Sequence, residues 1–228
     1  MIVDIQYSAS RNDWPALRDA VQQAEAEGYG TTWVFDHFDG ALLGGDRPML
    51  EAFTLLGALA ASTSTIRLGT LVANVANRHP ALLALAASSV QRISDGRFTI
   101  GIGAGTGPGT KWSREHDERG VALEPDVARR HAAVARQIGV LRAATDAPII
   151  VGASSVALGA LAGSLADGVN VRMSHGQVAS VIAAARETSA GRTFEVSGWA
   201  FAADPAAREH ADQLGLDRLV LVDLGALG

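Results

Sequence analysis

The 228-residue chain has no cysteine, one lysine (Lys111) and no apolar run of the length needed to cross a bilayer. Without cysteine it can form neither a disulfide framework nor a thiolate metal site, which is typical of a cytoplasmic protein. A transmembrane helix needs about 20 consecutive apolar residues, and the N-terminus, MIVDIQYSAS, lacks the basic region of a secretory signal. We therefore expect a cytoplasmic protein with no membrane partner.

A basic surface is also missing. Asp and Glu number 24 against 19 for Lys and Arg, the net charge is −5, and the positive residues are scattered along the chain. A nucleic-acid surface needs a clustered basic stripe, so we expect no nucleic-acid partner. No His and carboxylate residues stand at metal-ligand spacing, and we expect no metal site. His116 and His131 are expected to be solvated or on helix faces.

Short apolar runs alternate with longer, Ala-rich amphipathic segments along the whole chain. The apolar runs predict strands at 2–8, 31–35, 66–73, 98–103, 148–152, 168–173, 194–201 and 218–223. The amphipathic segments predict helices at 15–27, 51–61, 80–93, 124–143, 155–166, 176–188 and 205–214.

Continuous apolar strands that alternate with helices favour a parallel sheet covered by helices, of the α/β class. Eight such units predict a closed (β/α)₈ TIM barrel, and an open doubly wound sheet is the alternative. Because no linker or break in composition divides the chain, we expect a single domain over 1–228. The barrel is expected to be truncated, with only AATDA before the fifth strand and no helix after the eighth.

The second predicted strand runs straight into two titratable residues, Asp36 and His37, in TTWVFDHFDG. In a barrel of this kind the catalytic residues follow the C-terminal ends of the strands. His37 is suited to proton transfer near neutral pH, and Asp36 is expected to orient its ring. The alternative is that His37 only caps the strand by hydrogen bonding to a loop.

Three other strand ends carry residues suited to binding an anion. The fourth and fifth strands end in the small-residue loops GIGAG and VGASS, where the backbone can approach a phosphate closely. For the second loop the alternative is an ordinary Ser helix cap. After the third strand, Arg78 stands at a helix start and either binds an anion or pairs with a carboxylate. The long polar segment 105–124 contains Trp112, which is expected to cover a ligand.

Four segments together resemble the luciferase-like monooxygenase superfamily, and in particular its deazaflavin-dependent branch. They are TTWVFDHF, the stretch from LGALAASTSTIRLGTLVANVANRHP to SDGRFTIGIGAG, the stretch PIIVGASSVALGALAGSLADGVNV, and LGLDRLVLVDL. They cover well over half the chain in the family's order. Two positions depart from the family pattern, Asn77 for an aromatic residue and Thr106 for tryptophan, and the segment that walls the substrate pocket is reduced to AATDA.

The resemblance implies an oxidoreductase that moves a hydride between coenzyme F-420 and a small organic substrate. The alternatives are an FMN-dependent monooxygenase of the same fold and a non-catalytic flavin-binding protein. The resemblance implies a catalytic role for His37, a non-proline cis peptide around Leu71–Val72, and a homodimer formed through the helices at 51–61 and 80–93. We count Asp36 with His37 as catalytic because it stands beside it. The residues implied in cofactor binding are Leu71, Val72, Arg78, Gly103, Ala104, Gly105, Gly152, Ala153 and Ser154.

Overall fold

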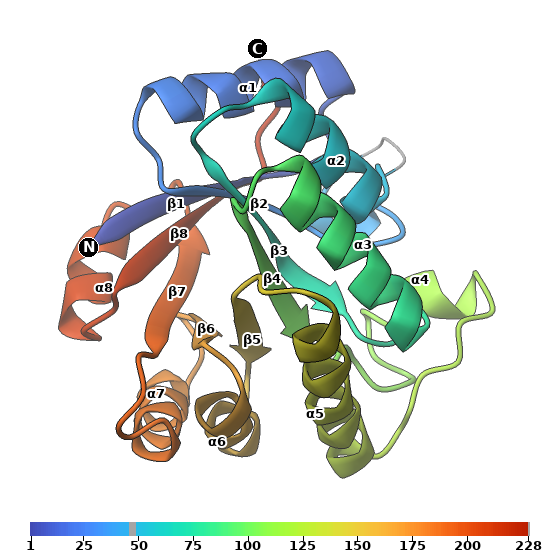
Figure 1. The fold of residues 1–228 in the computed structure, drawn as a ribbon, viewed down its shortest axis with the longest axis vertical. Helices are drawn as coiled ribbons and strands as arrows, with labels where there is room; N and C mark the ends of the chain where they lie inside the picture. The colour runs from blue at the N-terminus through green and yellow to red at the C-terminus, as the bar shows by residue number, and fades with distance from the viewer. Residues whose placement is uncertain (46–48, 228) are drawn as a thin grey trace.

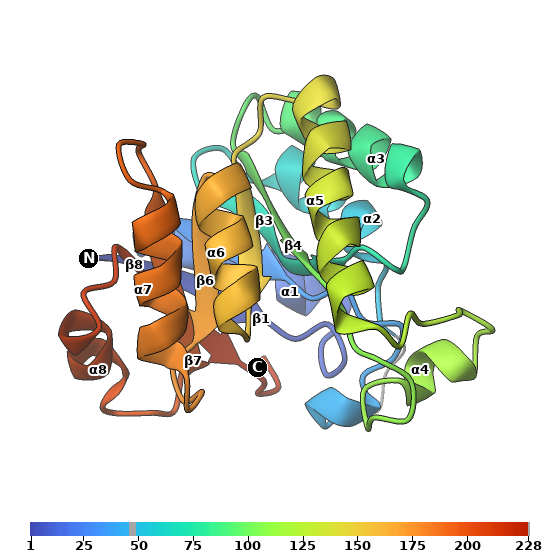
Figure 2. The same ribbon diagram turned by 90° about the horizontal axis from the view of Figure 1, so that it is seen from below.

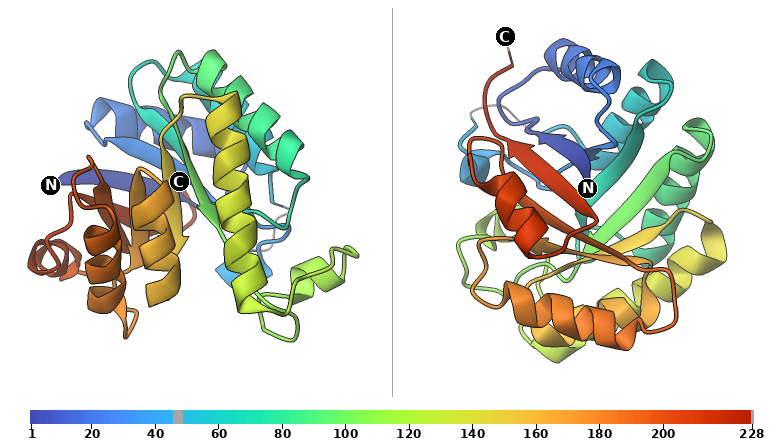
Figure 3. Two further views of the ribbon diagram at one scale, coloured as in Figure 1. Left: turned by 60° about the horizontal axis from the view of Figure 1, so that its bottom comes forward. Right: turned by 90° about the vertical axis from the view of Figure 1, so that its left-hand side faces the viewer.

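The computed structural model describes residues 1–45 and 49–227, and its eight parallel strands form a closed barrel in the order β1 to β8 (Figure 1). The strands are β1 (Ile2–Tyr7), β2 (Thr31–Val34), β3 (Arg67–Asn74), β4 (Phe98–Gly103), β5 (Ile149–Ala153), β6 (Gly168–Arg172), β7 (Glu195–Phe201) and β8 (Arg218–Asp223). The barrel closes where β1 pairs with β8, from Ile2 opposite Arg218 to Tyr7 opposite Asp223 (Figure 3, right). The predicted TIM barrel is confirmed, and the doubly wound alternative is wrong.

Helices cover the outside of the barrel (Figures 1 and 2). They are α1 (Trp14–Ala26), α2 (Ala52–Ser62), α3 (Pro80–Ile93), α4 (Arg114–Asp117), α5 (Val127–Ala144), α6 (Val156–Leu165), α7 (Val178–Thr188) and α8 (Ala207–Gln213), with a 3₁₀ helix, η1, at Ala41–Leu43. Within the described residues no helix follows β8, as expected. Among all the helices described, none is long and apolar enough to cross a membrane. The helices α4 and η1 were not predicted, because each is a short turn inside a loop.

Local sequence signals explain where the longer helices begin. Asp13 accepts a hydrogen bond from the N–H of Ala16 and Pro15 follows it, so α1 starts with a side-chain cap and a residue whose backbone is already helical. Asp126 caps α5 in the same way, through the N–H of Arg129. These caps satisfy backbone groups that the helix itself leaves unpaired.

Two apolar layers hold the barrel together. The larger layer lies between the helices and the strands, and a smaller cluster of Trp33, Leu71, Ile150 and Val220 fills the barrel interior. Below it the interior becomes polar: the Trp33 indole N–H donates to Asp4, which also receives a 2.7 Å hydrogen bond from Arg218. Burial raises the pKa of Asp4 to about 6, although Arg218 opposes the shift. A cavity of about 270 Å³, lined by charged residues that include Arg67, Glu195 and Arg218, lies at this end of the barrel. A larger, mostly apolar cavity lies at the opposite mouth.

The SDGR stretch before β4 has a structural role. The Arg97 guanidinium donates to the carbonyl oxygens of Ala60, Thr63, Ile66 and Ser94 and to the Thr63 hydroxyl, over 2.7 to 3.1 Å. It thereby satisfies carbonyl groups at the C-terminal end of α2 and in the turn that leads to β3. A planar group with five donors suits this role better than an ammonium group.

We expect Arg97→Lys to lower the free energy of unfolding by about 2 kcal/mol, because lysine keeps the charge but cannot reach all five acceptors. Denaturant unfolding measures the change. Arg136→Lys, on the exposed side of α5, is the matched control and should be neutral. Equal stability of the two variants would show that the hydrogen bonds of Arg97 contribute nothing.

Candidate active site

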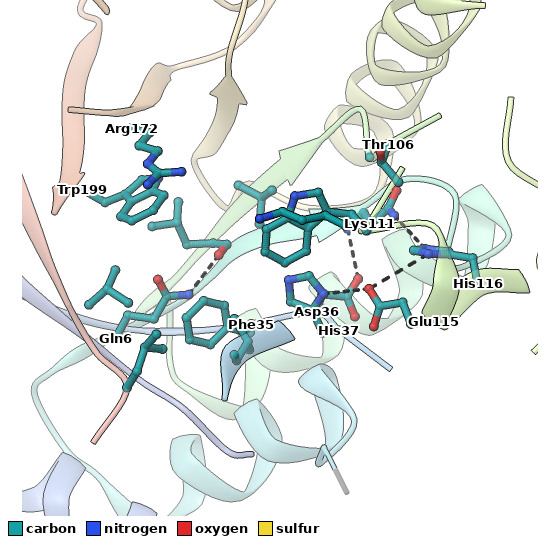
Figure 4. A pocket seen from close by; sticks show the side chains of 18 of the residues that line it. Gln6, Phe35, Asp36, His37, Thr106, Lys111, Glu115, His116, Arg172 and Trp199 are labelled. Atoms are coloured by element: carbon teal, nitrogen blue, oxygen red, sulfur yellow. Dashed lines mark hydrogen bonds and ion pairs between the residues drawn. The ribbon is translucent and has the colours of Figure 1, made fainter. Parts of the chain in front are cut away.

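A cavity of about 550 Å³ opens at the C-terminal ends of the strands, a size in the usual range for small-molecule sites (Figure 4). Its residues come from the ends of β1, β2, β3, β6, β7 and β8 and from the loop after β4. Aromatic and aliphatic side chains form most of the wall. They are Phe35, Leu43, Leu71, Val72, Trp112, Trp199, Phe201, Val222 and Leu224.

His37 lies in this cavity, and Glu115 holds its ring. The distance from His37 Nδ1 to Glu115 Oε1 is 2.7 Å. An ionised carboxylate can only accept a hydrogen bond, so Nδ1 must carry the proton. In the neutral ring Nε2 is then an acceptor, and it has no hydrogen-bond partner among the residues described. The site therefore contains a histidine held in one tautomer with a free basic nitrogen.

The Glu115 carboxylate also fixes the backbone after β2. Its second oxygen accepts the N–H of Phe38 at 2.7 Å and that of Asp39 at 3.2 Å. Burial by itself would raise the pKa of Glu115, but the hydrogen bonds from His37 and from the two N–H groups lower it below its ordinary value. Glu115 thus stays ionised at neutral pH, which the tautomer assignment for His37 requires.

Asp36 does not orient His37, which corrects the expectation from the sequence. Its carboxylate instead forms a two-pronged ion pair with Arg78, with both nitrogen–oxygen distances at 2.7 Å, and accepts the N–H of Asn74. Asp36 and His37 are therefore neighbours in sequence whose side chains face different partners.

Arg78 also differs from the expectation. Its guanidinium pairs with Asp36 and with Glu51, the residue that caps α2, and it is not among the residues that line the cavity. The ion-pair alternative is therefore the one that the structure supports. Arg78 joins the end of β2 to the starts of α2 and α3.

The polar segment after β4 folds back over the mouth of the barrel, where α4 lies near η1 (Figures 2 and 3). It brings Trp112 to 5.7 Å from the His37 ring, measured between ring centroids, and places Trp112 in the cavity wall. His116 is 2 % exposed, and its Nε2 contacts the side chains of Asn74 and Asn77. Of the two expected places for His116, solvent is wrong, because it is buried, and a helix is right, because it lies on α4. His131 lies half-buried on α5.

The peptide bond between Leu71 and Val72 is cis, which confirms the expectation for this strand end. Both residues line the cavity, and the carbonyl oxygen of Leu71 accepts a 2.9 Å hydrogen bond from the Gln6 amide. The result is an apolar surface near His37. This surface, the aromatic walls and the free Nε2 of His37 together fit a flat heteroaromatic ring such as a flavin or deazaflavin.

The glycines at the C-terminal ends of β4 and β5 have a packing role beside Val72. A Cβ at Gly103 would lie 2.6 Å from Val72 Cγ2, and a Cβ at Gly152 would lie 2.8 Å from Val72 Cγ1. Gly105, with φ of +63°, lines the cavity itself. Gly103, Ala104, Gly152, Ala153 and Ser154 do not line it, and Ser155 caps α6. Contact of these five residues with a cofactor tail stays a prediction.

Several site residues were missed from the sequence. Glu115 and His116 gave no signal, because they lie in a long loop without periodicity. Arg172 was detectable, since it is the charged residue at the end of a buried strand in VNVRMSH. Gln6 was also detectable, as an amide inside the apolar strand predicted at 2–8.

We expect Gly152→Ala to lower the free energy of unfolding by about 1–3 kcal/mol, because the new methyl group overlaps Val72. In the double variant with Val72→Ala the overlap is removed. Thermal and denaturant unfolding of both single variants and the double variant measure the coupling between the two positions. Losses that simply add would mean that Gly152 does not make room for Val72.

Comparison with known proteins agrees with this architecture. The profile of the family described as "Luciferase-like monooxygenase" matches residues 3–214. The chain is 28 % identical over 183 residues, 71 % of its length, to a 5,10-methylenetetrahydromethanopterin reductase of Methanolobus tindarius, and it spans only 52 % of that relative. It is 36 % identical over 91 residues, 39 % of its length and 26 % of the relative's, to an F-420-dependent glucose-6-phosphate dehydrogenase of Kineococcus radiotolerans.

Among solved structures, an F-420-dependent secondary alcohol dehydrogenase in complex with an F-420–acetone adduct aligns with a TM-score of 0.78. The alignment covers 98 % of this chain and 94 % of that one at 15 % identity, so it bears on the fold alone. The family match extends over nearly the whole chain. The chain belongs to the luciferase-like monooxygenase family.

Proposed function

We propose that the chain is an oxidoreductase that transfers a hydride between coenzyme F-420 and a small organic substrate. The observation that carries the proposal is His37, held by Glu115 with Nε2 free, beside the apolar surface of Leu71 and Val72. The name of one relative, an F-420-dependent glucose-6-phosphate dehydrogenase, favours F-420. FMN is the second candidate, because the family is described as monooxygenases. A flavin-binding protein without catalysis is the third.

In this proposal the cofactor supplies the hydride chemistry and the barrel supplies binding and orientation. Leu71 and Val72 would support one face of the cofactor ring, and Gln6 holds the backbone of that surface by donating to the Leu71 carbonyl. His37 accepts or returns the substrate proton at Nε2, and Glu115 stabilises the positive charge that then forms on the His37 imidazole. The aromatic walls exclude water from the reacting atoms.

Fluorescence titration of the purified protein with F-420 and with FMN tests the cofactor. We expect saturable binding of F-420 that is tighter than that of FMN. Tighter binding of FMN would instead favour the FMN-dependent monooxygenase. Binding of neither would contradict it.

We expect His37→Ala to lower turnover by about 100-fold or more, the usual contribution of a positioned acid or base, while leaving the affinity for the cofactor largely intact. Glu115→Gln should lower turnover less, because an amide still contacts the ring but no longer specifies its tautomer. Steady-state and binding measurements on both variants separate the two effects. An unchanged rate for His37→Ala with any substrate that the enzyme turns over would remove His37 from the mechanism.

We also propose a cytoplasmic homodimer formed through α2 and α3, which lie next to each other on one side of the barrel (Figure 1). Three apolar side chains of α3 support this surface, because Leu82, Leu85 and Ile93 are 60 %, 63 % and 55 % exposed. Small residues of α2, such as Gly57 and Ala58, allow close approach.

Light scattering coupled to size exclusion should give twice the monomer mass of 23.6 kDa at micromolar concentration. Leu85→Glu should shift the protein to the monomer, because it places a charge in the apolar contact. Leu165→Glu, at an exposed apolar position on α6, is the control and should leave the dimer intact. A wild-type protein that elutes as a monomer would contradict the dimer.

A further inference from the structure

Arg172 presents an unused positive charge to the cavity. It lies at the C-terminal end of β6, its guanidinium is 5.2 Å from the centroid of the Trp199 ring, and its Nε donates to the Ser174 hydroxyl at 2.8 Å. None of the carboxylates in the described chain lies within ion-pair distance of it. The two terminal nitrogens have no protein acceptor in the described residues, so they are available to a ligand.

The acidic residues of the cavity cannot supply a partner for Arg172. Asp36 is bound to Arg78, and Glu115 is bound to His37 and to two backbone N–H groups. Lys111, the second cation of the wall, lies over the Trp112 ring without a carboxylate partner in the part of the chain that is described. The charge left uncompensated in the cavity is therefore positive, although the whole protein carries −5.

The surface around Arg172 is apolar and aromatic. Trp199 packs edge-on against Phe201 with 5.6 Å between ring centroids, and Val222 and Leu224 continue the wall along β8. A ligand whose anionic group meets Arg172 would place its remaining atoms against these side chains. The Arg172 guanidinium lies over the Trp199 ring, and its two terminal nitrogens can meet the two oxygens of a carboxylate.

Arg172 and His37 occupy opposite sides of the mouth. β2 and β6 are four strands apart in either direction around the closed barrel, and Figure 4 shows Arg172 and Trp199 on the far side of the cavity from His37 and Glu115. A molecule bound between them would be held at one end by its charge and would present its other end to His37.

We propose that Arg172 binds the oxyanion of the substrate, and that the substrate class is a small organic acid with an apolar body. That this acid is a substrate rests on the proposed function, whereas its binding by Arg172 does not. Arg172 is then a residue that sets specificity by charge. The reaction at the other end of the molecule stays as described above.

Benzoate and benzamide test the proposal, because they share shape and differ in charge. In ligand-observed NMR titrations we expect the wild-type protein to bind benzoate about tenfold more tightly than benzamide, the usual worth of a charge-assisted hydrogen bond. Arg172→Gln should abolish the preference. Arg208→Gln makes the same change in net charge on exposed α8 and should keep it. Each titration is run without cofactor and with the cofactor that binds.

Equal affinity of the wild-type protein for the two probes would overturn the proposal. A preference that survives Arg172→Gln, or that Lys111→Gln removes instead, would also overturn it. If Arg172→Gln weakens cofactor binding and leaves the benzoate preference intact, Arg172 belongs to the cofactor. If the wild-type protein binds neither F-420 nor FMN, the proposed function fails. The titrations without cofactor still decide whether Arg172 binds the carboxylate.

Discussion

The Glu115 carboxylate joins two parts of the chain that lie 76 to 78 residues apart, and the geometry of the candidate site depends on it. One oxygen accepts the His37 ring proton, and the other accepts two N–H groups of the segment after β2. Charge-assisted hydrogen bonds of this kind are about twice as strong as neutral ones. Because Glu115 is 3 % exposed, water cannot easily replace these donors. The same contact that orients His37 also holds the loop that carries Trp112 and His116.

A second constraint comes from Val72. The side chain projects toward β4 and β5, and Gly103 and Gly152 provide the space that it occupies. Small residues at neighbouring strand ends are usually attributed to a ligand that approaches the backbone. Here it is the Val72 side chain of the protein itself that approaches the backbone of Gly103 and Gly152. The glycines shape the apolar surface that a ring would lie on, so they act on the site through Val72.

The strands, the longer helices and the barrel were predictable, because buried parallel strands are continuous apolar runs and the helices between them are amphipathic. His37 was also predictable, since it follows the end of β2, and the Leu71–Val72 surface was implied by the resemblance to the luciferase-like family. The partners of these residues were not. Asp36 stands next to His37 in the sequence, yet its carboxylate binds Arg78 from the end of the next strand. Glu115 comes from a loop whose path has no periodic signal.

The central claim is that the apolar surface of Leu71 and Val72 receives the ring of a flavin or deazaflavin beside a His37 that Glu115 holds. A crystal structure of the protein with bound F-420, or with FMN if that binds more tightly, tests it most directly. The account predicts the ring against Leu71 and Val72, with His37 Nε2 facing the reacting region and Nδ1 still bound to Glu115. A ring bound elsewhere, or a His37 turned away from the cavity with Glu115 released, would contradict the account.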